Sequence, residues 1–163
     1  MLTGKEDLLQ ALMDAYLMEK GTMEFYGLAA QKAVAKEARD AFEALSSWEE
    51  RHMDFIQFLY QAIQEDRDIQ GFEDFKARSR TPLAEGAIPV KDLEPKLECN
   101  FTDDLGAIIM ALEIEGKAYA LYHNLSQSAQ DANARVVFKD MMEQEAKHID
   151  YLKGARMKLA ETS

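Results

Sequence analysis

Four stretches of the chain place apolar residues at alternating steps of three and four, the spacing that keeps one stripe of an α-helix facing a neighbour. The first two stripes are Leu9, Leu12, Tyr16, Glu19, Met23, Tyr26, Ala30 and Ala33, then Ala38, Phe42, Leu45, Glu49, His52, Ile56, Leu59 and Ile63. The other two are Leu105, Ile108, Leu112, Glu115, Tyr119 and Tyr122, then Ala134, Phe138, Met141, Glu145, His148, Leu152 and Leu159. We therefore predict four long helices, the second over roughly 37–64 and the fourth over roughly 132–160.

Sequence signals for helix starts precede the first and third stripes. Thr3-Gly4-Lys5-Glu6 has the form of a capping box, in which Thr3 accepts from a first-turn N–H and Glu6 reaches back. Thr102-Asp103-Asp104 resembles an N-cap followed by first-turn acids. Between 65 and 101 the periodicity fades and all three prolines occur, so we predict a long crossover connection there.

The chain repeats itself without a gap at an offset of 96 residues. The offset pairs Glu19 with Glu115, Tyr26 with Tyr122, Arg39 with Arg135, Phe42 with Phe138, Glu49 with Glu145, His52 with His148 and Asp54 with Asp150. Each half is thus a predicted helical hairpin, over 5–64 and 103–160, carrying one glutamate and then a Glu-x-x-His pair. Joined by the crossover 65–101, the hairpins make one all-α domain over 1–163, a four-helix bundle.

Polar residues interrupt every stripe at a position where the pattern predicts burial. A carboxylate in an apolar interior costs several kcal/mol unless it is paired, and four are directed at the same interior: Glu19, Glu49, Glu115 and Glu145. Helical residues three apart can converge on one ion, as in each Glu-x-x-His pair. Two divalent cations would balance four glutamates, and mixed carboxylate and imidazole ligands suit iron, manganese or zinc. A metal-free hydrogen-bonded network is the alternative.

Composition and charge limit the partners that the protein can bind and indicate the compartment in which it works. With 163 residues, 47% of them hydrophobic, the chain can bury a sizeable core. Lys and Arg total 19 against 30 Asp and Glu, so there is no cationic excess to bind nucleic acid or an anionic membrane. A single cysteine forms no internal disulfide, and the first residues lack the pattern of a secretory signal. We therefore predict a cytoplasmic protein that binds neither nucleic acid nor membrane.

Three further residues could bind or pack in a functional site, and we predict a structural role or no special role for each. Trp48, next to Glu49, is predicted to pack at a helix contact or a dimer face. His123 lies off its stripe and is predicted to be exposed. Cys99 lies in the crossover, where no neighbouring residue marks it as activated.

The set Glu19, Glu49-x-x-His52, Glu115 and Glu145-x-x-His148, with a long middle crossover, resembles the ferritin-like diiron-carboxylate proteins. The stretches from Glu19 to Tyr26 and from Glu115 to Tyr122 look most like rubrerythrin-type domains, and the resemblance covers roughly 5–160. It implies a ferritin-like bundle that holds two iron ions per chain, with manganese or zinc as alternatives.

The resemblance also implies roles for individual residues. Glu49 and Glu145 would bridge the two ions, Glu19 with His52 would complete one, and Glu115 with His148 would complete the other. The remaining matched residues, Tyr26 and Tyr122, would hydrogen-bond ligand carboxylates.

Two features depart from rubrerythrins proper, and both bear on activity. Those proteins carry an extra glutamate three residues from the third-helix ligand, where this chain has Leu112 and Ala118, and a rubredoxin-like domain whose iron is held by four cysteines. The resemblance nevertheless implies a homodimeric oxidoreductase that reduces hydrogen peroxide or dioxygen, with electrons from an external donor. The alternatives are a ferroxidase-type iron-handling protein without peroxide turnover and a manganese catalase-like enzyme.

Overall fold

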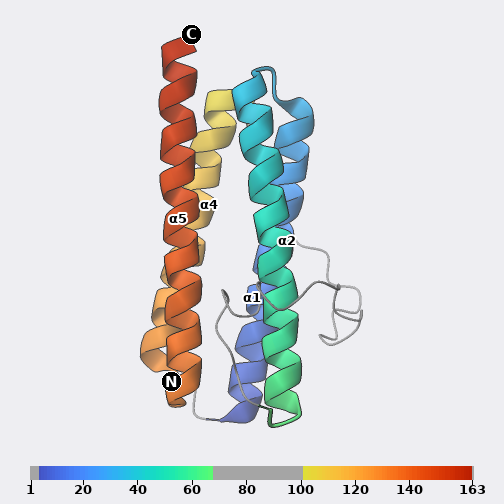
Figure 1. Ribbon diagram of the computed structural model, residues 1–163, viewed down its shortest axis with the longest axis vertical. Coiled ribbons are helices and arrows are strands. Elements are labelled where there is room, and N and C mark those ends of the chain that lie inside the picture. The colour runs from blue at the N-terminus through green and yellow to red at the C-terminus, as the bar shows by residue number, and fades with distance from the viewer. Residues whose placement is uncertain (1–3, 68–100, 163) are drawn as a thin grey trace.

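Four long helices make up a computed structural model that describes residues 4–67 and 101–162 (Figure 1). They are α1 (Lys5–Lys32), α2 (Lys36–Gln64), α4 (Asp104–Ser128) and α5 (Ala132–Thr162). Helices α1 and α2 pack along each other as one hairpin, and α4 and α5 form a second hairpin beside it. The prediction of an all-α four-helix bundle made of two hairpins is confirmed, and the helix bounds agree with the predicted ones to within two residues where these were given.

The end of the first hairpin and the start of the second lie far apart, at opposite ends of the bundle. Helix α2 ends at the end of the bundle opposite to the one where α4 begins (Figure 1). Each helix is consequently antiparallel to both of its packing neighbours. The crossover predicted over 65–101 falls almost entirely on residues 68–100, which, with Cys99, lie outside the described residues.

The helix starts follow the sequence signals in one case and depart from them in the other. The Asp103 side chain accepts a hydrogen bond from the Gly106 N–H at 2.7 Å, as predicted for an N-cap. In α1 the N-cap is Gly4 rather than Thr3, so the helix boundary differs from the prediction by one residue; the capping box itself depends on Thr3, which lies outside the described residues. Glycine adopts the extended N-cap conformation at little cost, and two acids, Glu6 and Asp7, lie in the first turn, where the helix dipole favours them.

Asp104, the first residue of α4, fastens one hairpin to the other. Its carboxylate accepts hydrogen bonds from the backbone N–H groups of Val34 and Ala35, the shortest at 2.8 Å. These two N–H groups lie in the turn between α1 and α2, so a side chain of the second hairpin satisfies donors of the first.

The Asp104 contact predicts a measurable loss of stability on truncation. Asp104→Ala should lower the free energy of unfolding by about 1 kcal/mol, because two turn N–H groups lose a charged acceptor. Urea denaturation of the metal-free protein measures this change. Asp150→Ala, at an exposed position of α5, is the matched control. Equal stabilities of the two variants would contradict the role given to Asp104.

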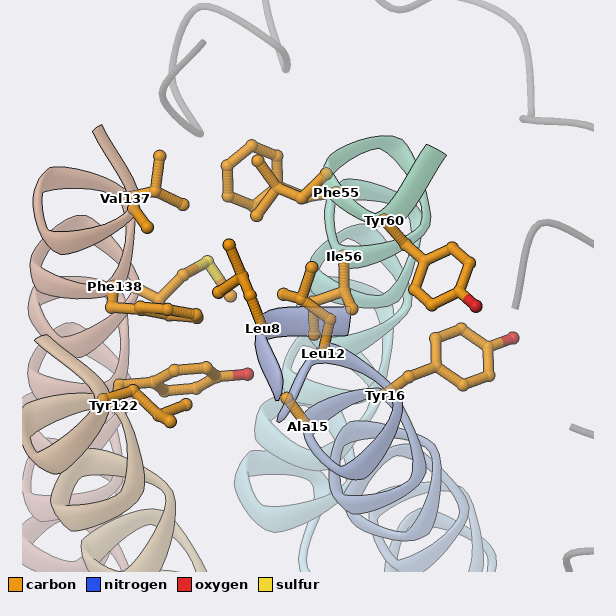
Figure 2. Close-up of a cluster of buried hydrophobic side chains, with 14 of the residues drawn as sticks. Leu8, Leu12, Ala15, Tyr16, Phe55, Ile56, Tyr60, Tyr122, Val137 and Phe138 are labelled. Atoms are coloured by element: carbon orange, nitrogen blue, oxygen red, sulfur yellow. The ribbon is translucent and has the colours of Figure 1, made fainter. Parts of the chain in front are cut away.

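Two apolar clusters fill the interior at different levels of the bundle. The first contains residues such as Leu12, Phe55, Tyr122 and Phe138, whose side chains meet between the helices in Figure 2. The second is built around residues such as Phe25, Tyr26, Phe42, Leu45, Ile108 and Leu152. On each helix the two clusters are separated by the polar positions that interrupt the stripes, which leaves a polar layer between two apolar ones.

The stripe predicted for α4 is only partly buried. Leu105 is 45% exposed and Tyr119 is 37% exposed, although both belong to the apolar stripe. The buried face of α4 keeps the stripe residues Ile108, Glu115 and Tyr122 and adds the alanines Ala111 and Ala118. The face that packing buries is therefore rotated toward the alanines, which leaves Leu105 and Tyr119 at its edge. None of the helices in the described ranges is both long enough and apolar enough to cross a membrane.

Candidate metal centre

All six residues that the sequence singled out as metal ligands lie in the polar layer. Their exposed fractions run from 0% to 4%. Each hairpin contributes one glutamate from its first helix and a Glu-x-x-His pair from its second. The complete set is Glu19 on α1, Glu49 and His52 on α2, Glu115 on α4, and Glu145 and His148 on α5.

His52 faces carboxylates from three helices. Its Nδ1 atom lies 3.1 Å from Glu145 Oε1, 3.4 Å from Glu49 Oε2 and 3.8 Å from Glu19 Oε1. The partner on α5 is therefore closer than the one that precedes His52 on its own helix. Such a convergence of one imidazole nitrogen and several carboxylate oxygens is typical of a metal site in a bundle.

His148, which belongs to the second hairpin, faces an equivalent set of three carboxylates. Its Nδ1 atom lies 3.0 Å from Glu49 Oε1 and 3.4 Å from both Glu115 Oε1 and Glu145 Oε2. Two glutamates, Glu49 and Glu145, thus contact both histidines, whereas Glu19 contacts His52 alone and Glu115 contacts His148 alone. The ligand atoms of Glu49, Glu145 and the two histidines all lie within 4.8 Å of one another.

Two tyrosines orient the outer carboxylates across the bundle. Tyr26 on α1 donates a hydrogen bond to Glu115 Oε1 at 2.5 Å, and Tyr122 on α4 donates one to Glu19 Oε1 at 2.5 Å. Each hairpin therefore supplies the donor for the glutamate of the other hairpin. Burial, reinforced by the neighbouring carboxylates, raises the pKa of both phenols well above its usual value, so they remain protonated donors.

Several carboxylate oxygens in this layer accept no hydrogen bond. They are Glu49 Oε2, Glu115 Oε2 and both oxygens of Glu145, all shielded from solvent. A buried anionic oxygen without a donor is costly, and a cation placed among these atoms would satisfy them together. The residues present therefore fit a metal ion, with carboxylate and imidazole ligands that suit iron, manganese or zinc.

The titration of these groups reflects how closely the charges are packed. Burial, together with the charges of Glu19 and Glu115, raises the pKa of Glu145 to about 8, and the pKa of Glu49 is also raised well above its usual value. Burial acts in the same direction on Glu19, but the neighbouring Glu49 and His52 side chains outweigh it and lower that pKa to about 2. Without metal, protons shared within the layer balance part of its negative charge.

Metal binding is consequently expected to release protons. Burial acts to lower the pKa of His148, but the carboxylates of Glu115, Glu145 and Glu49 outweigh it and raise the pKa to about 12, so the metal-free imidazole is protonated at neutral pH. A metal ion binds only the neutral ring, so its affinity should increase as the pH rises through the neutral range. Proton release on adding Zn²⁺ can be followed with a pH indicator in weakly buffered solution. A metal affinity that is the same at pH 6 and pH 8 would contradict this expectation.

Comparison with known proteins shows which family has this arrangement of helices and ligand candidates. A family model described as rubrerythrin matches residues 10–156. The chain belongs to the rubrerythrin family. The six buried ligand candidates and the two tyrosines of this rubrerythrin-family chain all lie inside the matched range.

A solved structure shares the fold of this rubrerythrin-family chain. It is a two-domain protein from Anabaena variabilis that contains DJ-1/ThiJ/PfpI-like and ferritin-like domains. The two structures agree with a TM-score of 0.69 at 17% sequence identity, over 99% of this chain and 39% of that one. This likeness shows a ferritin-like fold, and the present chain spans well under half of that protein's length. A search of the curated proteins found no match.

The structure also locates the residues near the site to which the sequence gave only structural roles. His123 is exposed on α4, as predicted. Trp48 packs at the contact between α2 and α5, one of the two positions predicted for it, but its partner is the ligand candidate His148, with ring centroids 5.5 Å apart. The only sequence signal for this contact is that Trp48 adjoins Glu49. Spacing along one helix does not reveal which residue of another helix an indole will meet.

Proposed function

We propose that the protein is a diiron oxidoreductase that reduces hydrogen peroxide, or dioxygen, with electrons supplied by an external donor. The observation that supports this most directly is the paired geometry, in which each histidine has its own outer glutamate and both share Glu49 and Glu145. Bound there, two iron ions would supply electrons and Lewis acidity to the O–O bond. Further parts of the proposal are a homodimer and a cytoplasmic location.

The residues of the chain have distinct tasks in this proposal. His52 with Glu19 would hold one ion, His148 with Glu115 the other, and Glu49 and Glu145 would bridge them. In the metal-free protein the shared glutamates carry raised pKa values, so metal binding would take the place of the protons they hold. Reduction of one hydrogen peroxide to two waters consumes two protons and two electrons.

The surroundings of the site support small oxidants over large substrates. Apolar side chains from two core clusters enclose the polar layer on both sides, with Tyr122 and Phe138 in one and Tyr26 and Phe42 in the other. Tyr26 and Tyr122 hold the outer glutamates in place by their hydroxyl groups. Such an enclosed site limits bulk water and suits a molecule of the size of peroxide or dioxygen.

Peroxide turnover with a reductant present tests the proposal. The protein is loaded anaerobically with Fe²⁺, desalted and mixed with hydrogen peroxide and an excess of a chemical electron donor, and peroxide is followed with an electrode. We expect many equivalents to be consumed per site, and we expect His52→Ala to lose this activity.

Three other results would each overturn the proposed function. Consumption that stops after about one equivalent would indicate a ferroxidase-type iron-handling protein. Peroxide loss with evolution of oxygen and no need for a donor would indicate catalase-like chemistry. Equal turnover by wild type and His52→Ala would place the reaction outside this site.

A further inference from the structure

A line of aromatic rings connects the surface to the metal centre on one side of the bundle. Tyr151 on α5 is 38% exposed, and its ring packs edge-on against Trp48 with centroids 4.8 Å apart. The Trp48 ring stacks on His148 at 5.5 Å with an interplanar angle of 22°. His148 in turn stacks on His52 at 4.8 Å and 11°. Each ring in this line touches the next, and the last two belong to ligand candidates.

The internal repeat does not reproduce this line on the other side. At the offset of 96 residues, Gln144 occupies the position of Trp48 and Phe55 occupies that of Tyr151. Gln144 is 8% exposed and Phe55 is 0% exposed, so that side offers no oxidisable ring at the surface in the equivalent place. The ligands and the tyrosines that bond them obey the twofold relation, whereas Trp48 and Tyr151 break it, so this pair is not a by-product of the repeat.

We propose that Trp48 and Tyr151 carry single electrons between the protein surface and the metal centre, by way of the His148 ring. The proposal rests on the proposed function, because it needs an oxidant that acts at the site. Indole and phenol are the side chains that lose one electron most readily, apart from thiols, and ring contact keeps each transfer short. Trp48 is the only tryptophan in the sequence.

The electron balance of the route is simple. Hydrogen peroxide takes up two electrons and two protons to give two waters, and a site that holds a single electron lacks one of them. Trp48 supplies the missing electron and is left oxidised by one electron. Tyr151 returns an electron to the indole and releases its phenolic proton to solvent, which its exposure permits. An external one-electron donor then reduces the Tyr151 radical, which regains a proton from water, and a second donor electron restores the single electron of the site.

Freeze-quench EPR spectroscopy of the iron-loaded protein tests the route by a readout other than turnover. The protein is reduced to one electron per site, mixed with hydrogen peroxide without a donor and frozen within milliseconds. Wild type should give an organic radical with the hyperfine pattern of tyrosine. Tyr151→Phe should shift the signal to the pattern of tryptophan, and Trp48→Phe, which keeps a ring for packing, should reduce the radical yield at least tenfold.

Tyr119→Phe is the matched control, because Tyr119 is 37% exposed and makes no ring contact within the described part of the chain. It should give the wild-type signal. Iron content and circular dichroism establish that each variant is folded and loaded. An undiminished yield in Trp48→Phe, a loss of signal in Tyr119→Phe, or no organic radical in wild type would each overturn the route.

The same samples separate failure of the route from failure of the proposed function. Their peroxide consumption is measured in parallel with an excess of donor. If wild type consumes peroxide catalytically but forms no radical that depends on Trp48, only the electron route is wrong. If wild type consumes no peroxide, the proposed function is wrong and the route falls with it.

Discussion

Replacing His148 by alanine should reduce the metal content from about two ions per chain to one or fewer. His148 is the only imidazole that contacts Glu115, and its Nδ1 atom also lies 3.0 Å from Glu49. Without the ring, that half of the site retains only carboxylates, which favour their protonated forms in a desolvated interior. His52→Ala should have the same effect, because the twofold relation gives it the equivalent position.

Metal analysis after anaerobic Fe²⁺ loading and desalting measures this loss directly. The third histidine of the sequence offers the control, because His123 is exposed on α4 and His123→Ala should keep the wild-type content. Circular dichroism should show retained helices in all three variants, since protons taken up by the raised-pKa carboxylates Glu49 and Glu145 offset the lost positive charge. His148→Gln, which keeps most of the side-chain volume, guards against a purely structural effect. Full metal content in both His148 variants would refute the assignment.

Removing the metal should lower the stability of the whole bundle. A ligand that binds only the folded state at about 1,000 times its Kd stabilises that state by about 4 kcal/mol. For a domain of this size, that corresponds to a fall in Tm on the order of 10 °C when a chelator strips the site. The physical reason is the set of shielded carboxylate oxygens that accept no hydrogen bond, among them both oxygens of Glu145.

Thermal unfolding followed by circular dichroism, with Zn²⁺ or with chelator, measures this difference without redox chemistry. His52→Ala is the informative comparison, because it should show a much smaller response to the metal. Identical Tm values for wild type in zinc and in chelator would contradict this prediction. They would mean that protons alone neutralise the buried carboxylates of the polar layer.

The positions of the ligand candidates could be predicted from the sequence because helical periodicity assigns each residue to a face. A glutamate or histidine at a buried position of an apolar stripe, such as Glu19 or His148, stands out against the pattern. The repeat then places the two halves at the same level of the bundle. The periodicity follows from local helix geometry and the repeat from comparing the two halves, and both are visible in a single sequence.

Contacts between helices could not be predicted in the same way. The family resemblance implied that Tyr26 and Tyr122 hydrogen-bond carboxylates, but the repeat does not tell whether a tyrosine faces its own hairpin or the other one. The exposure of Leu105 and Tyr119 was missed because an apolar stripe can be wider than the face that packing buries. The Asp104 contact with the α1–α2 turn depends on how the two hairpins dock, which no local pattern reveals.

The twofold arrangement of the polar layer means that neither hairpin contains a complete site. The hairpin of α1 and α2 carries Glu19, Tyr26 and a Glu-x-x-His pair, and that of α4 and α5 carries the same inventory. Two identical copies of an ancestral hairpin would therefore have supplied every ligand, with each tyrosine reaching into the other copy. Fusion of such copies into one chain would have freed each half to diverge while the ligands stayed equivalent. The unequal pair Trp48 and Gln144, at matching positions of the two halves, is a difference that two identical copies could not hold.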